Sequence, residues 1–242
     1  MSTNNTEVKK KGLDKNSNVY IITYATVMVV LVATILAAVA MSLQDKQAFN
    51  VLNEKRQAIL TALAAPEGTS YEEYINAYAV DASGKKISSI TSDAVLDLLT
   101  DLPASYENKT LPVFAAADGR VVIPVTGSGL WGPIWGYVAL ERDMNTISGI
   151  VLDHASETPG LGAEIATEKH QDQYKGKKIF EGNDFVSVTL VKGGASTTMP
   201  AASHEVDGIT GGTKTANGVS AMLFDSLDAY VPLLNSLKSN NK

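Results

Sequence analysis

A stretch near the C-terminal end of the chain combines residue types that suit phosphate chemistry. It reads Asp207-Gly208-Ile209-Thr210-Gly211-Gly212-Thr213, with one carboxylate, two hydroxyls and three glycines. Glycine lets the backbone approach a bulky group closely and adopt positive φ. An apolar segment that predicts a helix follows, and a helix start offers free N–H groups and a positive dipole end. The spacing therefore predicts a seat for a phosphate beside a hydroxyl.

The same stretch resembles the acceptor motif of flavin transferases, Asp-x-x-(Ser/Thr)-Gly-(Ala/Gly)-(Ser/Thr). In that motif FMN is joined through its phosphate to the hydroxyl of the last residue, which is Thr213 here. The resemblance makes the other motif positions cofactor-binding residues: Asp207, Thr210, Gly211 and Gly212. Alanine is commoner at the position of Gly212. Thr210 and Thr215 also carry hydroxyls, so the assignment of the acceptor rests on register. A Gly/Thr-rich turn that only caps a helix is the competing interpretation.

A second candidate is the stretch Glu157-Thr158-Pro159-Gly160-Leu161-Gly162. Pro159 fixes one φ, while the two glycines free their own. These residues predict a tight loop whose backbone can face a flat ring. The side chains of Glu157 and Thr158 could then bond the edge of an isoalloxazine or orient the loop. A plain structural turn is the alternative.

Single aromatic and imidazole side chains near these stretches leave two interpretations open. His154 is the obvious candidate for a general base, although a lone histidine before a loop is more often a structural hydrogen-bonding partner. Trp131 and Trp135 pack a core, or Trp131 stacks on a flavin. A hydrolase is disfavoured, since Asp153, His154 and Ser156 are adjacent in sequence and no Gly-x-Ser-x-Gly elbow occurs.

Composition excludes several classes of site. The chain has 242 residues, a net charge of −6 and no cysteine. Disulfides, iron–sulfur clusters and thiol chemistry are therefore excluded, and binding to nucleic acid is not expected. The three histidines show no metal-ligand spacing, so no metal site is predicted. The sequence contains no Walker-type loop, and we expect no NADH site in this chain.

One segment near the N-terminus predicts a membrane anchor. Residues Val19 to Leu43 include no charged side chain. A helix of roughly 20 apolar residues crosses a bilayer core. A cleavable signal peptide is the competing interpretation, because Ala38-Val39-Ala40 looks like a cleavage site. The apolar run is too long for that, since signal-peptide cores are roughly 7–15 residues.

Charge around the anchor predicts its orientation. Four lysines precede it, namely Lys9, Lys10, Lys11 and Lys15. The positive-inside bias then places the N-terminus in the cytoplasm and the rest of the chain outside. Beyond the anchor, 16 basic and 24 acidic residues give a net charge of −8. That balance suits an exported domain at a bacterial inner membrane and argues against a polybasic lipid-binding surface.

The remaining elements must position these candidates, and they can be predicted coarsely. We expect helices at 47–64, 94–99 and 219–237, and a helical spacing of Tyr71, Tyr74 and Tyr78. Asp118-Gly119 predicts a hairpin between 111–114 and 120–125, 130–140 predicts a strand pair or one bent strand, and 185–192 predicts a strand. Helices and strands without regular βαβ alternation indicate an α+β fold.

Two longer stretches, Gly129-Leu130-Trp131-Gly132-Pro133-Ile134-Trp135-Gly136-Tyr137-Val138-Ala139-Leu140 and His154 to Gly162, extend the resemblance. Together with Val206–Thr213 they resemble the C subunit of the Na+-translocating NADH:quinone oxidoreductases in order and spacing. The resemblance covers most of the chain after residue 110. The G subunit of Rnf-type ferredoxin:NAD oxidoreductases is similar and shares the His154–Gly162 stretch, whereas the Gly-Leu-Trp element favours the quinone reductase.

The resemblance implies a membrane-anchored α+β flavoprotein subunit of a respiratory sodium pump. It implies FMN bound covalently to Thr213, electron relay toward quinone, and as partners the other subunits and a flavin transferase. The expected layout is a cytoplasmic tail (1–18), a transmembrane helix (19–43), a membrane-proximal helical region (44–110) and an FMN-binding region (111–242). The alternatives are the Rnf-type subunit and a non-redox assembly or FMN-sensing subunit.

Overall fold

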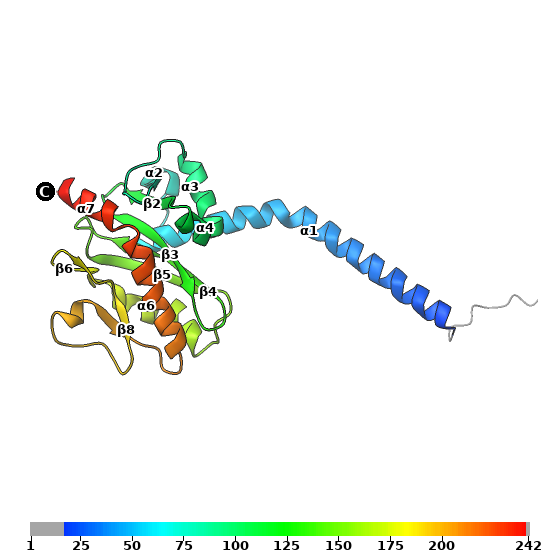
Figure 1. The fold of residues 1–242 in the computed structure, drawn as a ribbon. Coiled ribbons are helices and arrows are strands. Elements are labelled where there is room, and N and C mark those ends of the chain that lie inside the picture. The colour runs from blue at the N-terminus through cyan, green and yellow to red at the C-terminus, as the bar shows by residue number, and fades with distance from the viewer. Residues whose placement is uncertain (1–16, 241–242) are drawn as a thin grey trace, which may run out of the picture. The chain divides into compact units, whose positions relative to one another are not determined.

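The chain divides into two compact units, one ending at Val51 and the other beginning at Leu52 (Figure 1). The computed structural model describes residues 17–240, so the lysines that carry the predicted orientation lie outside the described residues. Helix α1 (Asn18–Ala62) takes in the apolar run Val19–Leu43 and the expected helix that follows it. Among residues 17–240, it is the one helix long and apolar enough to cross a membrane.

The second unit is built on a five-stranded antiparallel sheet in the order β1-β2-β3-β4-β5. The strands are β1 (Ile75–Val80), β2 (Leu111–Ala116), β3 (Val121–Ser128), β4 (Pro133–Leu140) and β5 (Ile147–His154). The Asp118-Gly119 hairpin lies between β2 and β3, as predicted, with Gly119 at φ +88°. The sheet and its covering helices confirm the α+β fold.

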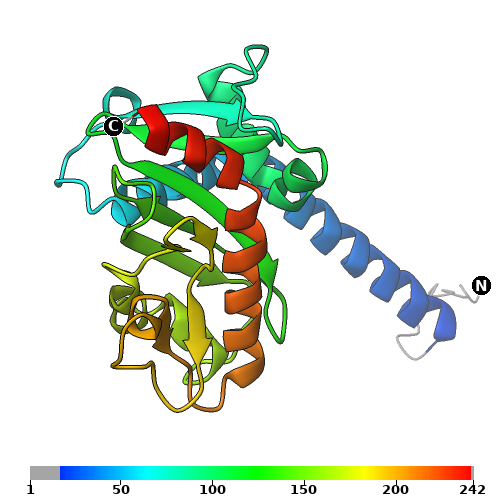
Figure 2. The same ribbon diagram turned by 60° about the vertical axis from the view of Figure 1, so that its left-hand side comes forward.

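Both faces of the sheet are covered. Successive side chains of a strand point to opposite faces, and the run Val121–Val125 of β3 is buried throughout. One face carries Val121, Ile123 and Val125, which join a core with the buried side of helix α6 (Thr213–Asp228). The opposite face carries residues such as Val122, which pack with the C-terminal end of α1 and with helix α3 (Ser92–Leu98). In Figure 2, α6 runs across the first of these faces.

The predicted closing helix 219–237 is wrong at both ends. Helix α6 already begins at Thr213, and a second helix, α7 (Val231–Asn240), follows a break at 229–230. Pro232 in the first turn of α7 cannot donate a helical hydrogen bond, so it cannot continue α6. Tyr230 is fully buried at the break, and its hydroxyl donates to the Pro112 carbonyl at 2.8 Å.

The predicted strand 185–192 is also wrong, because it is interrupted. Strand β7 (Asp184–Phe185) pairs with β6 (Phe180–Glu181), whereas β8 (Thr189–Val191) pairs in parallel with β9 (Glu205–Asp207). Between them Ser187 has φ +62°, and its amide donates to the Ile179 carbonyl at 3.0 Å. After this kink, β8 pairs with β9, and the acceptor stretch begins at the last residue of β9.

Two strands of the five-stranded sheet, β1 and β5, were not predicted. Tyr71 and Tyr74 delimit the short helix α2 (Tyr71–Tyr74), but Tyr78 lies on the edge strand β1, so the helical spacing misled. Strand β5 closes the other edge of the sheet. Region 130–140 is one strand, β4, preceded by a turn. The remaining short elements are α4 (Leu102–Glu107), α5 (Glu168–Gln171) and 3-10 turns at Leu99–Asp101, Gly162–Ala166, Asp172–Tyr174 and Ala201–Ser203.

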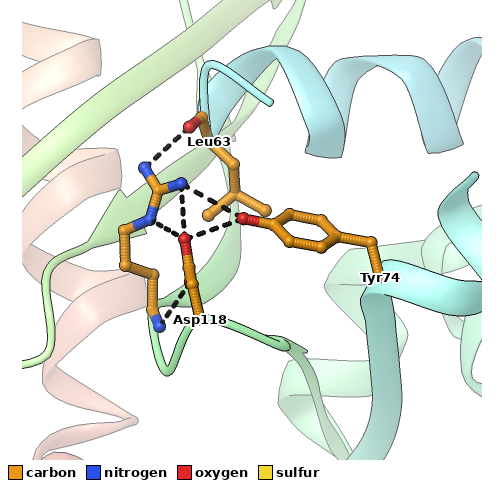
Figure 3. A network of polar contacts seen from close by, with 4 residues as sticks. Leu63, Tyr74 and Asp118 are labelled. Carbon is orange, nitrogen blue, oxygen red and sulfur yellow. Dashed lines mark hydrogen bonds and ion pairs between the residues drawn. The ribbon is translucent and has the colours of Figure 1, made fainter. Parts of the chain in front are cut away.

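A polar network holds the residue after α1 against the β2–β3 hairpin (Figure 3). The Arg120 guanidinium donates to the Leu63 carbonyl at 2.7 Å and to the Asp118 carboxylate at 2.7 Å. The Tyr74 hydroxyl also donates to that carboxylate at 2.7 Å. Burial alone would raise the pKa of Asp118, but the hydrogen bonds from Arg120 and Tyr74 outweigh it and lower the pKa to about 2.

Candidate functional site

Three segments that the sequence singled out meet at one side chain, Glu157. One Glu157 oxygen accepts the Trp131 amide at 2.8 Å, from the turn between β3 and β4. The other accepts the Thr215 hydroxyl at 2.6 Å, from the first turn of α6. Glu157 itself lies in the loop after β5. The Gly-Leu-Trp turn, the Pro-Gly loop and the acceptor stretch therefore form one site.

Residue Glu157 is only 5% exposed, and its carboxylate bonds groups within the protein. Burial alone would raise the pKa of Glu157, but the hydrogen bonds from Thr215 and the Trp131 amide outweigh it and hold the pKa below its ordinary value. The Glu157 amide donates to Nδ1 of His154 at 3.2 Å. His154 is thus a structural hydrogen-bonding partner of this loop, in line with the second of the two interpretations of that residue.

The start of α6 presents the acceptor stretch at the surface. Gly211 has φ +76°, a conformation that favours glycine, and the buried Gly212 is the residue from which α6 starts. Thr213 is the first residue of the helix, and its side chain is exposed. The first amides of a helix have no partner within it. The exposed Thr213 therefore lies at the helix start, together with the first amides of α6.

The structure separates the three threonine hydroxyls near this point. Thr215 is 1% exposed, and its hydroxyl donates to Glu157. Thr210 and Thr213 are both exposed. A modifying enzyme can therefore reach Thr210 and Thr213, whereas the Thr215 hydroxyl is enclosed.

Asp207, the acidic residue of the stretch, lies at the end of β9 and serves a neighbouring loop. Its carboxylate accepts the Ala195 amide at 2.8 Å, and its own amide donates to the Gln173 side-chain oxygen at 2.8 Å. Gly194, just before Ala195, has φ +110°. Asp207 therefore fixes the Gly193–Gly194 turn beside the acceptor stretch.

The Pro-Gly loop is a tight turn, as predicted. The Thr158 carbonyl accepts the amides of Leu161 and Ala163, both at 3.1 Å, and Gly160 has φ +75°. Residues 158–161 are all exposed, including Pro159. The Leu161 side chain, 42% exposed, lies against the acceptor stretch, since a Cβ on Gly211 would be 2.5 Å from Leu161 Cδ2.

The Gly-Leu-Trp turn exposes its two large apolar side chains, Leu130 and Trp131. Trp131 is 65% exposed, so it does not pack a core, whereas Trp135 is half-buried on β4. The backbone of Trp131 is nevertheless held at both ends. Its amide donates to Glu157, and its carbonyl accepts the Ser156 hydroxyl at 2.8 Å.

No local sequence signal marks the Glu157–Thr215 pair, whose members lie 58 positions apart. The part of the chain described, residues 17–240, has no group of three acidic, histidine or cysteine side chains that could hold a metal ion. What the site offers is an exposed hydroxyl at a helix start, flanked by exposed apolar side chains on fixed backbone.

Comparison with known proteins gives this arrangement a family. The FMN-binding domain family matches residues 129–228, a range that includes all three segments of the site. The C subunit of the Na(+)-translocating NADH-quinone reductase of Vibrio anguillarum is 31% identical over 243 residues, with 90% of each chain covered. That of Chlamydia muridarum is 41% identical over 133 residues, and this chain spans 42% of its length.

A solved structure agrees with these relatives. The crystal structure of the corresponding C subunit from Parabacteroides distasonis is 40% identical, has a TM-score of 0.70, and is matched over 79% of this chain and 96% of its own. The similarity to the Vibrio protein covers 90% of this chain, and the residues matched by the family model include those of the site. The chain belongs to the family of Na+-translocating NADH-quinone reductase C subunits.

Proposed function

We propose that this protein carries FMN as a phosphoester on Thr213 and relays electrons within a membrane-bound Na+-translocating NADH:quinone oxidoreductase. The observation that carries the proposal is the exposed Thr213 hydroxyl at the first residue of α6. The nearby Thr215 hydroxyl is enclosed by Glu157. The family match to FMN-binding domains covers this helix start.

The residues present fit a phosphate group. A phosphodiester on Thr213 keeps one negative charge, and the positive end of the α6 dipole stabilises it. The free amides at the helix start supply hydrogen-bond donors. Gly211, at φ +76°, shapes the turn before the helix, and Thr210, three residues before Thr213, is also exposed.

The residues present also fit a flat aromatic ring at the surface. Three exposed apolar side chains, Leu130, Trp131 and Leu161, belong to the segments that Glu157 joins. The Thr158–Gly160 backbone lies at the surface in the same loop. When bound, FMN supplies the redox chemistry, and these residues fix its place.

A covalent link answers a problem that surface exposure creates. A ring that exchanges electrons with neighbouring carriers must remain partly exposed, which reduces its binding area. A tether replaces weak binding by a high local concentration at the site. The proposal therefore includes a flavin transferase as the partner in maturation and the other redox subunits as partners in function.

The apolar part of α1 anchors the chain in the bacterial inner membrane, with the N-terminus in the cytoplasm and the domain in the periplasm. The support is the length and apolar character of α1 and the lysines before it. A reporter that is active only after export, fused to the C-terminus, should be active. An inactive fusion would overturn the orientation, and a mature N-terminus near Met41 would overturn the anchor.

The attachment is tested by single variants of the full chain, co-expressed with a flavin transferase. Thr213→Ala should lose flavin fluorescence in a denaturing gel and the added intact mass, because the acceptor hydroxyl is gone. Thr210→Ala should keep both. Loss of flavin in Thr210→Ala and retention in Thr213→Ala would place the attachment at Thr210 instead.

The relay is tested in the assembled complex. Thr213→Ala should abolish NADH-driven quinone reduction while the subunits still assemble, since the electron path loses one carrier. The isolated protein should not oxidise NADH. Normal quinone reduction and sodium pumping in a complex shown to lack this flavin would favour an assembly or FMN-sensing role.

A further inference from the structure

Glu157 is the buried carboxylate of the site, and it contacts all three segments. We infer that Glu157 is a positioning residue that holds the first turn of α6, and with it Thr213, against the Trp131 turn. The inference rests on the proposed function, because it concerns the same flavin site. Of the two expectations for this side chain, it favours orienting the loop over a bond to the edge of the ring.

The contacts of the carboxylate explain why it does not face a bound ring. One oxygen accepts the Trp131 amide at 2.8 Å, and the other accepts the Thr215 hydroxyl at 2.6 Å. Both oxygens are thus engaged inside the protein, at 5% exposure. Hydrogen bonds to an ionised acceptor are the stronger ones, so two of them fix their donors firmly.

Two glycines make room for the Glu157 side chain. A Cβ on Gly129 or on Gly162 would collide with the Glu157 carboxylate. Glycines thus line it from the Trp131 turn on one side and from the Pro-Gly loop on the other. The packing makes the carboxylate a close contact point between these segments.

The position of Thr213 depends on this contact because of its place in α6. Thr213 and Thr215 belong to the same first turn of the helix. Fixing the Thr215 side chain fixes that turn, while the bond from the Trp131 amide fixes the backbone that carries the exposed indole. Glu157 therefore sets the relation between the attachment point and the exposed apolar side chains.

The chemistry of the two donors separates a hydrogen-bonding role from simple filling of space. The Trp131 amide can only donate, but the Thr215 hydroxyl can also accept. In Glu157→Gln the amide oxygen can accept from Trp131, while the new NH2 group donates to Thr215. Glu157→Met fills the space and makes neither bond. If Glu157 acts through these hydrogen bonds, Glu157→Gln should keep the site in order and Glu157→Met should not.

The first measurement needs no flavin. Hydrogen–deuterium exchange in the detergent-solubilised full chain, expressed without transferase, is followed in peptides that cover 129–135. In Glu157→Met the Trp131 amide should exchange roughly tenfold faster or more, as expected when a bond to a charged acceptor is lost. Glu157→Gln should stay near the wild type, as should Glu168→Gln, the same change at an exposed position of α5.

The second measurement uses the flavin-loaded full chain. Visible circular dichroism of the flavin reports how firmly the ring is held. The signal should fall in Glu157→Met and persist in Glu157→Gln, with Thr213 still modified by intact mass. If Glu157→Met does not fold, Thr215→Val removes one donor only, and it should lower the flavin signal while the Trp131 amide stays protected.

The outcomes divide clearly. Unchanged Trp131 exchange and flavin signal in Glu157→Met would overturn the inference, and so would a glutamine variant as impaired as the methionine one. Failure of the wild type to take up flavin on Thr213 would overturn the proposed function instead. The exchange result in flavin-free protein does not depend on that loading, so the two failures are distinguishable.

Discussion

Gly162 shows at the scale of one residue how little space the site leaves. A Cβ there would collide with the Glu157 carboxylate and lie 2.6 Å from the Thr215 hydroxyl. Gly162→Ala should therefore destabilise the domain by about 2–3 kcal/mol, the upper part of the range for overpacked cores. Chemical denaturation of the domain measures this loss of stability.

Gly160 provides the matched control two positions earlier in the same loop. A Cβ at Gly160 would meet open space, although its φ of +75° disfavours a side chain. Gly160→Ala should cost only about 1 kcal/mol, as expected for a left-handed conformation. An equal or larger loss in Gly160→Ala than in Gly162→Ala would contradict the packing around Glu157.

The sequence indicated which candidate residues are exposed better than it indicated their buried contacts. The glycines and threonines of the acceptor stretch indicate an exposed turn by their own local preferences, and Thr213 is exposed. Glu157 has no such local signal, because its role is set by a hydroxyl 58 positions away. Sequence spacing alone could not show that its carboxylate turns inward, or that Asp207 bonds the Ala195 amide.

At the scale of elements, the Arg120–Asp118 network couples the end of α1 to a hairpin, and it should be sensitive to acid. The pKa of Asp118 is lowered from 3.8 to about 2 in the folded protein. A lowered pKa means that the carboxylate stabilises the fold above about pH 4 and that this contribution is lost as the pH falls toward 2. Asp118→Asn should remove the contribution.

The check is the difference in unfolding free energy between the wild type and Asp118→Asn as a function of pH. The difference should be constant above about pH 5 and shrink toward pH 2. Asp81→Asn is the comparison, because the hydrogen bonds that the Asp81 carboxylate accepts from described residues come from Ser83 and Lys85, within one turn. If the difference in unfolding free energy between the wild type and Asp118→Asn grew on acidification, it would contradict the stabilising role of the ionised Asp118.

The junction of α6 and α7 makes a second prediction at this scale. Tyr230 is fully buried, and its hydroxyl reaches the Pro112 carbonyl, 118 positions away. Tyr230→Phe leaves that carbonyl without this donor and should cost about 1–2 kcal/mol in thermal or chemical unfolding. Tyr78→Phe on β1 is the control, because the Tyr78 hydroxyl shows no hydrogen bond to a described residue. This variant should lose almost no stability.

Elements with a strong local signal were predicted and the others were not. The β2–β3 hairpin was predicted correctly, because an Asp-Gly pair between two apolar stretches is a local signal for a hairpin turn. Strand β1 was missed, since three tyrosines at helical spacing hid an edge strand that forms only against β2. The break in 185–192 depends on Ser187 bonding Ile179, a tertiary contact that a strand pattern does not reveal.

At the scale of the whole molecule, the division at Val51 and Leu52 predicts a separable domain. The hydrophobic cores of the second unit begin with Ile59. A chain that starts at Leu52 should therefore be soluble and fold with nearly the melting temperature of the full chain in detergent. Circular dichroism and size-exclusion chromatography check this expectation.

A second truncation makes that test discriminating. A chain that starts at Tyr71 loses four buried core residues, Ile59, Leu60, Ala62 and Leu63. It should be poorly soluble or melt far lower, because the face of the sheet that they cover becomes exposed. A well-folded product from Tyr71 would contradict the role of the end of α1 in the core. The apolar run, the helix expected after it and the α+β class were clear from the sequence pattern, whereas the face of the sheet that the end of this helix covers was not.

The position of α6 in the chain has a consequence for biogenesis. Strand β3 is synthesised long before the helix that covers it, and the Ser226 hydroxyl that meets the Thr126 amide comes 100 residues later. The sheet therefore leaves the ribosome with one apolar face uncovered until the last helices arrive. We expect Thr213 to become the first residue of a helix only when α6 has folded onto this face of the sheet. The flavin attachment proposed for Thr213 would therefore be limited to chains that extend through α6, and chains truncated before residue 227 should remain unmodified.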